Sequence, residues 1–587
     1  MLGIKRFIIG VILCAAAFSF AAELEENWND FLHYTAIGRF ELARGYGEEI
    51  INGQTDPVEL LELSQTNSRG YSILLKVYND NDQLKDVAGK ILELIEEGRY
   101  IKRTDPAIIR EEIARLSTTI RGRIKGEQSL KNSGEYAVPF MLEALADRSR
   151  KDEQPYIAAA MGKMGRDAIR SLACSLQMDN IAVKSEVIRA LGQIQYPEAL
   201  AYLKFVQENG SSEEVKALAV KSIEMIDPAA LKIPSTKLFF NLAESYYYHS
   251  DSIAPSADYD FANVWFWDDA ENRLKREQVS KDYFFELMAM RSCEWALKAD
   301  AANASAISLW LTAFFKAEQP GIEMPEYFGE GHADAMTYAT TSGPEYLHEA
   351  LARGLKDGDA YICLNMVEAL AVNAGQASLL YRFGTEQPLV EALSFEDDAV
   401  KLSAAVAIAS ADPTDEFTGS KLIIENLNTA IERSKEAELG QELALEYAFR
   451  AINAMKELAI SNNSVVDLEK ANDSLIEVLS GDNDELRFIA AEILAMLKNP
   501  MSQRAIAELA LSEDYDNDTR ITLFGSLTES AKKNGQQLTE EQIDQIYAIT
   551  SSSDVDPQLR AAAAGAYGAF NLPSKRVKEL ILDQSKS

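Results

Sequence analysis

Residues that carry acid–base and metal chemistry are scarce in this sequence. Only four histidines occur in 587 residues, at His33, His249, His332 and His348. Histidine is the side chain that most often transfers protons near neutral pH and ligates zinc, so its scarcity excludes most sites of these two kinds. The sequence also has no GxSxG, HExxH, phosphate-binding Walker or dinucleotide-binding glycine motif. We therefore expect neither a common enzyme chemistry nor a cofactor.

Cysteine is equally scarce, and its spacing shows no paired motif. Of the four cysteines, Cys14 lies in the N-terminal apolar run, which leaves Cys174, Cys293 and Cys363. These three are far apart, form no CxxC pair, and each lies inside a helix-like apolar stretch. The pattern predicts small buried hydrophobic residues rather than a disulfide framework or a metal site.

Positive charge is in short supply, and long apolar runs are absent after the N-terminus. Lysine and arginine number 58 against 92 aspartate and glutamate residues, a formal charge of −34. Such a surface repels nucleic acid and anionic lipid, so neither is expected as a partner. One locally basic stretch, residues 102–131, is expected to form ion pairs with neighbouring acidic helices. No further run is long enough for a membrane span.

The N-terminus has the three-part pattern of a secretory signal peptide. Lys5 and Arg6 precede an apolar run over Phe7–Phe20, and small residues lie just before Ala22. This pattern predicts a signal peptide over residues 1–21, cleavage before Ala22, and a periplasmic or extracellular protein. Lipid attachment at Cys14 is the alternative, although the residues before it lack the small side chain of a lipidation signal.

What the sequence does contain is an internal repeat. The segment IAVKSEVIRALGQIQ from Ile181 aligns with PYIAAAMGKMG from Pro155 at a shift of 30 residues. A recurring element places an apolar residue before Lys or Arg, after a short acidic or polar turn. The turn is expected to cap a helix, and the charged residue is expected to lie off the apolar face. This element occurs at Val183–Lys184, Val215–Lys216, Val400–Lys401, Leu486–Arg487 and Leu559–Arg560.

These repeats resemble the HEAT-repeat, armadillo-type family over residues 136–228 and 344–582, in a protein of the secreted bacterial kind. The helix LFFNLAESYYYH, from Leu238, and the helix AMRSCEWALKADAANA, from Ala289, are similar to the two helices of a TPR unit. Residues 28–51 also resemble a TPR-type helix pair, more faintly. The resemblance implies an all-α fold, an α-solenoid of HEAT-like and TPR-like helix pairs. The expected regions are 22–132 (TPR-like), 133–228 (HEAT-like), 229–343 (TPR-like, with insertion 249–281 and loop 320–343) and 344–587 (HEAT-like).

The insertion contains VWFWDDAENRLKREQV, which is unusual in a helical sequence. Two β-prone runs, Val264–Trp267 and Leu274–Val279, flank the turn-forming DDAEN and predict a short hairpin. Alternation then places Trp265 and Trp267 on one face and Phe266 on the other.

Two roles for this aromatic hairpin remain open. It packs on its own flanking helices and fills the seam between the two repeat arrays, or one tryptophan stays available to anchor a partner. In the first case the covering residues are Tyr246, Tyr247, Phe284 or Phe285. In the second, the candidate partner-binding residues are Trp265, Phe266, Trp267 and Tyr259.

A second candidate site lies in the loop over residues 320–343. If the segment is extended, Glu330, His332 and Asp334 point to one side, and these are residue types that ligate metal ions. The alternative is that Asp334 caps the short helix AMTYAT and that His332 is an ordinary loop residue.

Together these patterns favour an exported binding scaffold whose concave surface holds a protein or peptide partner. This expectation follows from the resemblance to HEAT and TPR proteins and does not name the partner. A structural component of an envelope assembly is one alternative. An enzyme is another, because some HEAT-like families resemble bilin lyases.

Overall fold

The computed structural model describes residues 22–53, 55–325, 327, 331–434 and 441–584. The predicted signal peptide, residues 1–21, lies outside them. The chain forms two compact units: residues up to Lys281 with Lys298–Ala301, and residues Asp282–Leu297 with those from Ala302 onward. Both are built almost entirely of helices, as the repeats predict.

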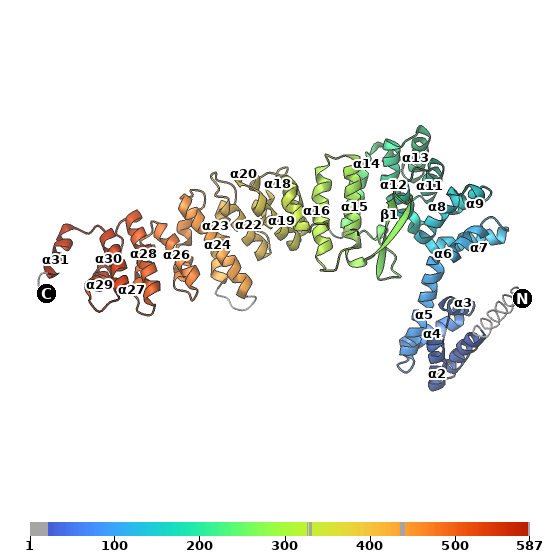
Figure 1. Cartoon of the computed structure of the whole chain (residues 1–587), viewed down its shortest axis with the longest axis horizontal. Coiled ribbons are helices and arrows are strands. Elements are labelled where there is room, and N and C mark those ends of the chain that lie inside the picture. Colours follow the sequence, from blue (N-terminus) through green and yellow to red (C-terminus); the bar gives the residue numbers. More distant parts are fainter. Residues whose placement is uncertain (1–21, 54, 326, 328–330, 435–440, 585–587) are drawn as a thin grey trace, which may run out of the picture. The chain divides into compact units, whose positions relative to one another are not determined.

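The first unit combines packed helices with a two-stranded antiparallel hairpin (Figure 1). One core contains residues between Leu24 and Ile95, and a second contains residues between Ile109 and Leu274, so the hairpin belongs to the second core. The elements are a helix that includes residues 22–36, α2 (Phe40–Asn52), α3 (Pro57–Thr66), α4 (Ser68–Asp80), α5 (Lys85–Thr104), α6 (Pro106–Arg115), α7 (Ile120–Ser133), α8 (Val138–Ala146), α9 (Gln154–Met161), α10 (Ile169–Ser175), α11 (Ile181–Ile194), α12 (Leu200–Asn209), α13 (Glu213–Ile226), α14 (Ser235–Tyr247), β1 (Phe261–Asp268) and β2 (Arg273–Ser280).

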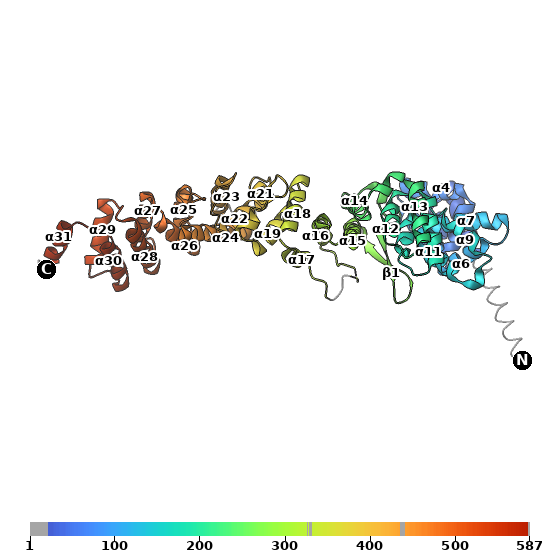
Figure 2. The ribbon, with the colours of Figure 1, turned by 90° about the horizontal axis from the view of Figure 1, so that it is seen from above.

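The second unit is a stack of helices in two layers, which Figure 2 shows from above. In one layer α22, α24, α26, α28 and α30 each contact the next, and in the other α23, α25, α27 and α29 do the same. The helices are α15 (Phe284–Ala299, its last two residues in the first unit), α16 (Ala304–Glu318), α17 (Ala335–Ser342), α18 (Pro344–Asp357), α19 (Ala360–Asn373), α20 (Gln376–Leu379), α21 (Pro388–Ala392), α22 (Asp398–Ser410), α23 (Ser420–Arg433), α24 (Gln441–Ser461), α25 (Asn472–Leu479), α26 (Asp484–Met496), α27 (Pro500–Leu511), α28 (Asn517–Asn534), α29 (Glu540–Ser551), α30 (Pro557–Ala569) and α31 (Ser574–Gln584). Such layering is the architecture of an α-solenoid.

The recurring sequence element marks the start of a helix at each of its five positions. The polar turn residue is the N-cap, and its side chain accepts a hydrogen bond from the backbone N–H of the apolar residue three positions later. That apolar residue is buried in every case. The pairs are Asn180 with Val183, Ser212 with Val215, Asp397 with Val400, Asn483 with Leu486 and Asp556 with Leu559. The predicted capping role of these turns is confirmed.

The charged residue of the element does not always lie off the buried face. Arg487 is buried, and its guanidinium donates hydrogen bonds to the carbonyls of Leu479, at 3.2 Å, and Gly481. Similarly, Arg560 donates to the carbonyl of Ser552 at 3.1 Å. The expectation that the charged residue lies off the buried face is therefore wrong for Arg487, because a long side chain can turn back and satisfy the carbonyls that end the preceding helix.

The three cysteines that follow the N-terminal segment are buried, as predicted, and none of them forms a disulfide. Burial is the largest cause that raises the pKa of the Cys363 thiol to about 12, and the carboxylate of Asp359 adds to it. Cys363 is therefore a neutral core residue. No helix in the described part of the chain has both the length and the apolar character to cross a membrane.

Candidate functional site

The hairpin places its two tryptophans on the same face. In the antiparallel register, Trp265 is opposite Arg276, Trp267 is opposite Leu274, and Phe266 is opposite Lys275. Cross-strand partners share a face of the sheet, so Trp265, Trp267, Leu274 and Arg276 point one way and Lys275 points the other. The predicted hairpin and its alternation are confirmed.

Trp265 holds the hairpin against the helices of the first unit. Only 6% of its surface is exposed. Its indole N–H donates a hydrogen bond to the carboxylate of Glu135, at 2.8 Å, which also accepts one from Asn263. Glu135 belongs to η1 (Gly134–Ala137), and the thiol of Cys174 in α10 donates to the Trp265 carbonyl at 3.3 Å. Trp265 is thus bound on both its side chain and its backbone.

The loop that enters the hairpin is fixed by a buried polar cluster. Arg170 lies 3.4 Å from Glu198 and donates hydrogen bonds to the carbonyls of Ile253 and Ala254, both at 3.2 Å. The hydroxyl of Tyr246 donates to the same Glu198 carboxylate at 2.5 Å, and burial raises the pKa of Tyr246 well above its ordinary value. A charge pair that is buried and hydrogen-bonded in this way specifies one geometry for the loop.

Aromatic and arginine side chains of α5 and η1 pack against the start of β1, at the end of the hairpin away from its turn. The ring of Tyr100 meets those of Tyr136, Tyr259 and Phe261 edge-on, at centroid distances of 6.2, 5.4 and 6.0 Å. The Arg103 guanidinium lies 5.5 Å from the ring of Tyr136 and 5.7 Å from that of Tyr259. Burial is also the largest cause that raises the pKa of Tyr259. Tyr259 therefore forms part of the packing between the hairpin and α5.

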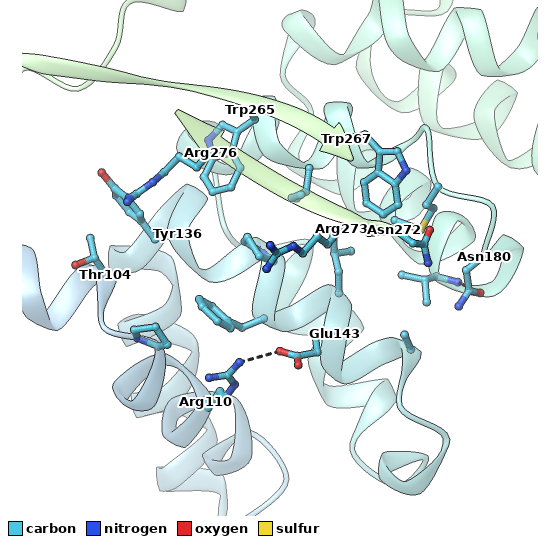
Figure 3. Close-up of a pocket in the computed structure, with 18 residues that line it drawn as sticks. Thr104, Arg110, Tyr136, Glu143, Asn180, Trp265, Trp267, Asn272, Arg273 and Arg276 are labelled. Atoms are coloured by element: carbon cyan, nitrogen blue, oxygen red, sulfur yellow. Dashed lines mark hydrogen bonds and ion pairs between the residues drawn. The ribbon is translucent and has the colours of Figure 1, made fainter. Parts of the chain in front are cut away.

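A pocket of about 590 Å³ opens beside this packed region (Figure 3). Trp265 and Trp267 project into it from the hairpin, and Arg110 of α6 faces Glu143 of α8 across an ion pair of 3.1 Å. The ring of Phe140 lies 4.7 Å from the Arg110 guanidinium. The lining also includes Pro106, Tyr136, Pro139, Leu142, Met178, Asn180, Val183, Asn272, Arg273, Leu274 and Arg276. Its walls thus come from α6, η1, α8, the start of α11 and the hairpin.

The pocket lining suits binding better than proton transfer. It contains three arginines and a single carboxylate, Glu143, and that carboxylate is paired with Arg110. The remaining titratable group is the Tyr136 hydroxyl. Burial raises its pKa to about 12, which keeps the hydroxyl protonated at neutral pH. Arginine, tryptophan and tyrosine are the residues that dominate binding energy at protein interfaces.

The four predicted partner-binding residues lie in different surroundings. Trp265 and Trp267 both line the pocket, but Trp265 is buried whereas Trp267 is only half-buried. Phe266 is half-buried on the opposite face, and Tyr259 packs on Arg103. Whether any of the four contacts a partner stays a prediction.

Sequence reasoning missed the helical wall of this pocket. Arg110, Phe140 and Glu143 precede the hairpin by more than a hundred residues, and no local pattern relates them to it. The basic stretch 102–131 contained one usable signal. Its predicted ion pairs are present, for example Lys102 with Glu62 at 2.8 Å, and Arg110 forms such a pair at the edge of the pocket.

The predicted metal site lies partly outside the described residues, since Glu330 is not among them. Asp334 is the N-cap of α17 and accepts a hydrogen bond from the backbone N–H of Thr337 at 2.7 Å. Hydrogen bonding to Thr337 lowers the pKa of this carboxyl. Among the described residues, no group of three or more His, Cys, Asp or Glu side chains is placed to hold a metal ion. The capping alternative for Asp334 is confirmed, and the metal site stays a prediction.

Comparison with known proteins identifies the repeats of the first unit. Residues 138–224 match the family model for HEAT repeats, which is less than half of the chain. No curated protein matches the chain. Solved structures that align with the chain include She4p, at 10% identity over 96% of this chain and 92% of that one, with a TM-score of 0.33. Importin beta aligns at 11% identity over 93% of this chain and 71% of that one, with a TM-score of 0.29. The SYS-1/POP-1 complex aligns at 8% identity over 94% of this chain and 99% of that one, with a TM-score of 0.28. These values are too low to transfer a partner or an activity. The layered helices make the chain an α-solenoid, and its residues 138–224 match the family model for HEAT repeats.

Proposed function

We propose that the protein is an exported helical-repeat scaffold that binds a protein or peptide partner at the pocket between the hairpin and the HEAT repeats. The pocket carries this proposal because it combines tryptophan, tyrosine and arginine in one place. Such residues give the largest interface energies when a rigid support holds them, since little side-chain entropy is then lost on binding. The hydrogen bonds of Trp265 supply that support.

The solenoid supports the same proposal on a larger scale. Stacked helices present an extended surface, which HEAT-like proteins often use as a concave binding face. We propose that the stacked helices of this chain present such a concave surface to the partner. The lining of the pocket favours binding over the enzyme alternative. A purely structural role in an envelope assembly predicts no partner at the pocket.

Export rests on the signal-like segment 1–21 and on the acidic residues that follow it. We propose cleavage before Ala22 and a periplasmic or extracellular location. Sequencing the N-terminus of the protein from its native host tests this, and the expected first residue is Ala22. An intact Met1, or a lipid on Cys14, would contradict it.

Site-specific photocrosslinking in the exporting cell tests the binding function. Asn272 is exposed in the hairpin turn and lines the pocket, whereas Lys275 is exposed on the opposite face of the hairpin. A benzophenone amino acid at Asn272 should crosslink to a discrete protein, and the same group at Lys275 should not. Trp267→Ala should abolish the Asn272 crosslink. Equal crosslinking at both positions, or none at either, contradicts the proposal.

A further inference from the structure

We propose that the pocket selects an acidic peptide segment with an apolar side chain at its centre. This inference rests on the proposed binding function and adds the chemistry of the partner. Arginines around an apolar floor fit a carboxylate on either side of a hydrophobic anchor. Three features of the pocket support it: the arginines in its lining, the presence of one arginine that is not in an ion pair with any described residue, and the apolar walls between these charges.

The lining is positive although the whole chain is strongly negative. Arg110, Arg273 and Arg276 face one carboxylate, Glu143, in a chain whose formal charge is −34. Salt screens charges beyond about 8 Å at physiological ionic strength, so an occupant responds mainly to the local arginines. A short acidic segment can therefore pair with arginine side chains that line the pocket.

The three arginines differ in how far their charge is already compensated. Arg110 is paired with Glu143, and Arg273 is paired with Glu271 beside it. Arg276 lies 4.9 Å from the Tyr136 ring, is exposed, and forms no ion pair within the described part of the chain. Its guanidinium is therefore the group best placed to bind a carboxylate, and the aromatic ring beneath restricts where it points.

An apolar surface lies between these charges. The half-buried side chains of Trp267 and Phe140 form it together with Pro139 and Leu142. A volume of about 590 Å³ is within the ~300–1,000 Å³ of sites that enclose a small ligand or a few side chains. A hydrophobic residue of the partner can enter here while its acidic neighbours reach Arg276 and Arg273.

Single-stranded nucleic acid also combines negative charge with rings that stack on tryptophan. It is the weaker candidate, because its phosphates continue beyond the pocket. There they meet a surface that carries 92 acidic against 58 basic residues along the chain. An acidic peptide brings its charge only where the arginines are.

Fluorescence anisotropy with defined probes tests the inference on the chain from Ala22 to Ser587. Three labelled pools of nine-residue peptides carry Leu, Phe or Trp at the centre, with flanks of Asp/Glu, Ser/Asn or Lys/Arg. The acidic pool should bind at least about tenfold more tightly than the neutral pool, because hydrogen bonds to charged groups contribute this much. The basic pool should not bind.

Two exposed positions on the same strand provide the variant and its control. Arg276→Gln should weaken binding of the acidic pool about tenfold. Lys275→Gln removes the same charge on the opposite face and should change it less than twofold. Circular dichroism checks that both variants are folded. An equal effect of the two substitutions overturns the inference, because it indicates only a general response to net charge.

Other outcomes also overturn it. The first is that the neutral pool binds as tightly as the acidic pool. The second is that a dT nonamer binds more tightly than the acidic pool, and the third is that no pool binds. If the Asn272 crosslink to a partner is nevertheless found in cells, only the acidic chemistry fails. If that crosslink is absent as well, the proposed binding function fails with it.

Discussion

The structure predicts that the two tryptophans of the hairpin have separable roles. Trp265 is 6% exposed and hydrogen-bonded to Glu135, whereas Trp267 is half-buried in the pocket. Trp265→Ala should therefore destabilise the attachment of the hairpin, and Trp267→Ala should mainly weaken binding. Trp265→Phe is the intermediate variant, because it keeps a buried ring but removes the indole donor.

The magnitudes follow from what each substitution removes. Replacing a buried tryptophan with alanine costs ~3–5 kcal/mol of stability, from lost transfer energy and the cavity left behind. Trp265→Phe should cost ~1–3 kcal/mol, the range for a hydrogen bond to a charged group. Glu135 is half-buried and keeps its bond from Asn263, so water can compensate part of this loss. Trp267→Ala should cost about 1 kcal/mol, as a typical substitution does.

Hydrogen exchange measured by mass spectrometry on peptides covering Phe261–Ser280 is the suitable assay. It reports local opening, whereas one unfolding curve of a long repeat protein does not define a single free energy. A loss of ~3 kcal/mol corresponds to exchange about a hundredfold faster for Trp265→Ala. Lys275→Ala, on the exposed face, should leave exchange nearly unchanged. If Trp265→Ala exchanges as slowly as the unsubstituted protein, Trp265 does not hold the hairpin, and the reasoning is refuted.

Two further predictions concern a glycine contact and a buried histidine. Gly98→Ala should destabilise the first unit by more than ~1 kcal/mol, because a Cβ there would lie 2.0 Å from the carbonyl oxygen of Pro57. Gly45→Ala meets no atom within 4 Å and should stabilise α2 by ~0.5–1 kcal/mol. Hydrogen exchange of peptides from α2 and α5 measures both effects, and the reverse order would contradict the packing. His348 donates from Nε2 to the Ser378 carbonyl at 2.7 Å, and burial lowers its pKa below 6.5 while that bond opposes the shift. The unfolded state then binds more protons, so the free energy of unfolding should fall as pH drops from about 6.5 toward the lowered pKa. His348→Gln should remove most of that pH dependence, and an unchanged slope would exclude His348 as its source.

Features determined by neighbouring residues could be predicted from the sequence. The turn residues Asn180 and Asn483 cap helices three positions later, and the hairpin depends on two β-prone runs around one turn. Each of these interactions involves a few residues in a row, where periodicity and turn chemistry are informative.

Features that depend on residues far apart in the sequence could not be predicted from it. Arg110 and Phe140 reach the pocket only because the helices of the first unit stack beneath the hairpin. The repeat pattern places Arg487 off the apolar face, yet the length of its side chain allows it to donate hydrogen bonds to carbonyls at the end of the preceding helix. A single sequence contains no signal that relates such partners. The metal prediction at Asp334 stays a prediction because Glu330 lies outside the described residues, and the role that is visible for Asp334 is that of an N-cap.

The attachment of the hairpin to earlier helices has a consequence for how the first unit folds. In a simple solenoid each repeat contacts its neighbours, so folding can begin anywhere and spread. Here the bonds from Asn263 and Trp265 to η1 span 127–130 residues, and that from Gln278 to Tyr100 spans 178. Contacts between such distant segments slow folding, because a long loop must close before they form. A chain synthesised from its N-terminus therefore cannot complete this unit until about residue 280 has emerged. A chain that ends at Pro228 lacks the closing strand pair even though all of its HEAT match is present.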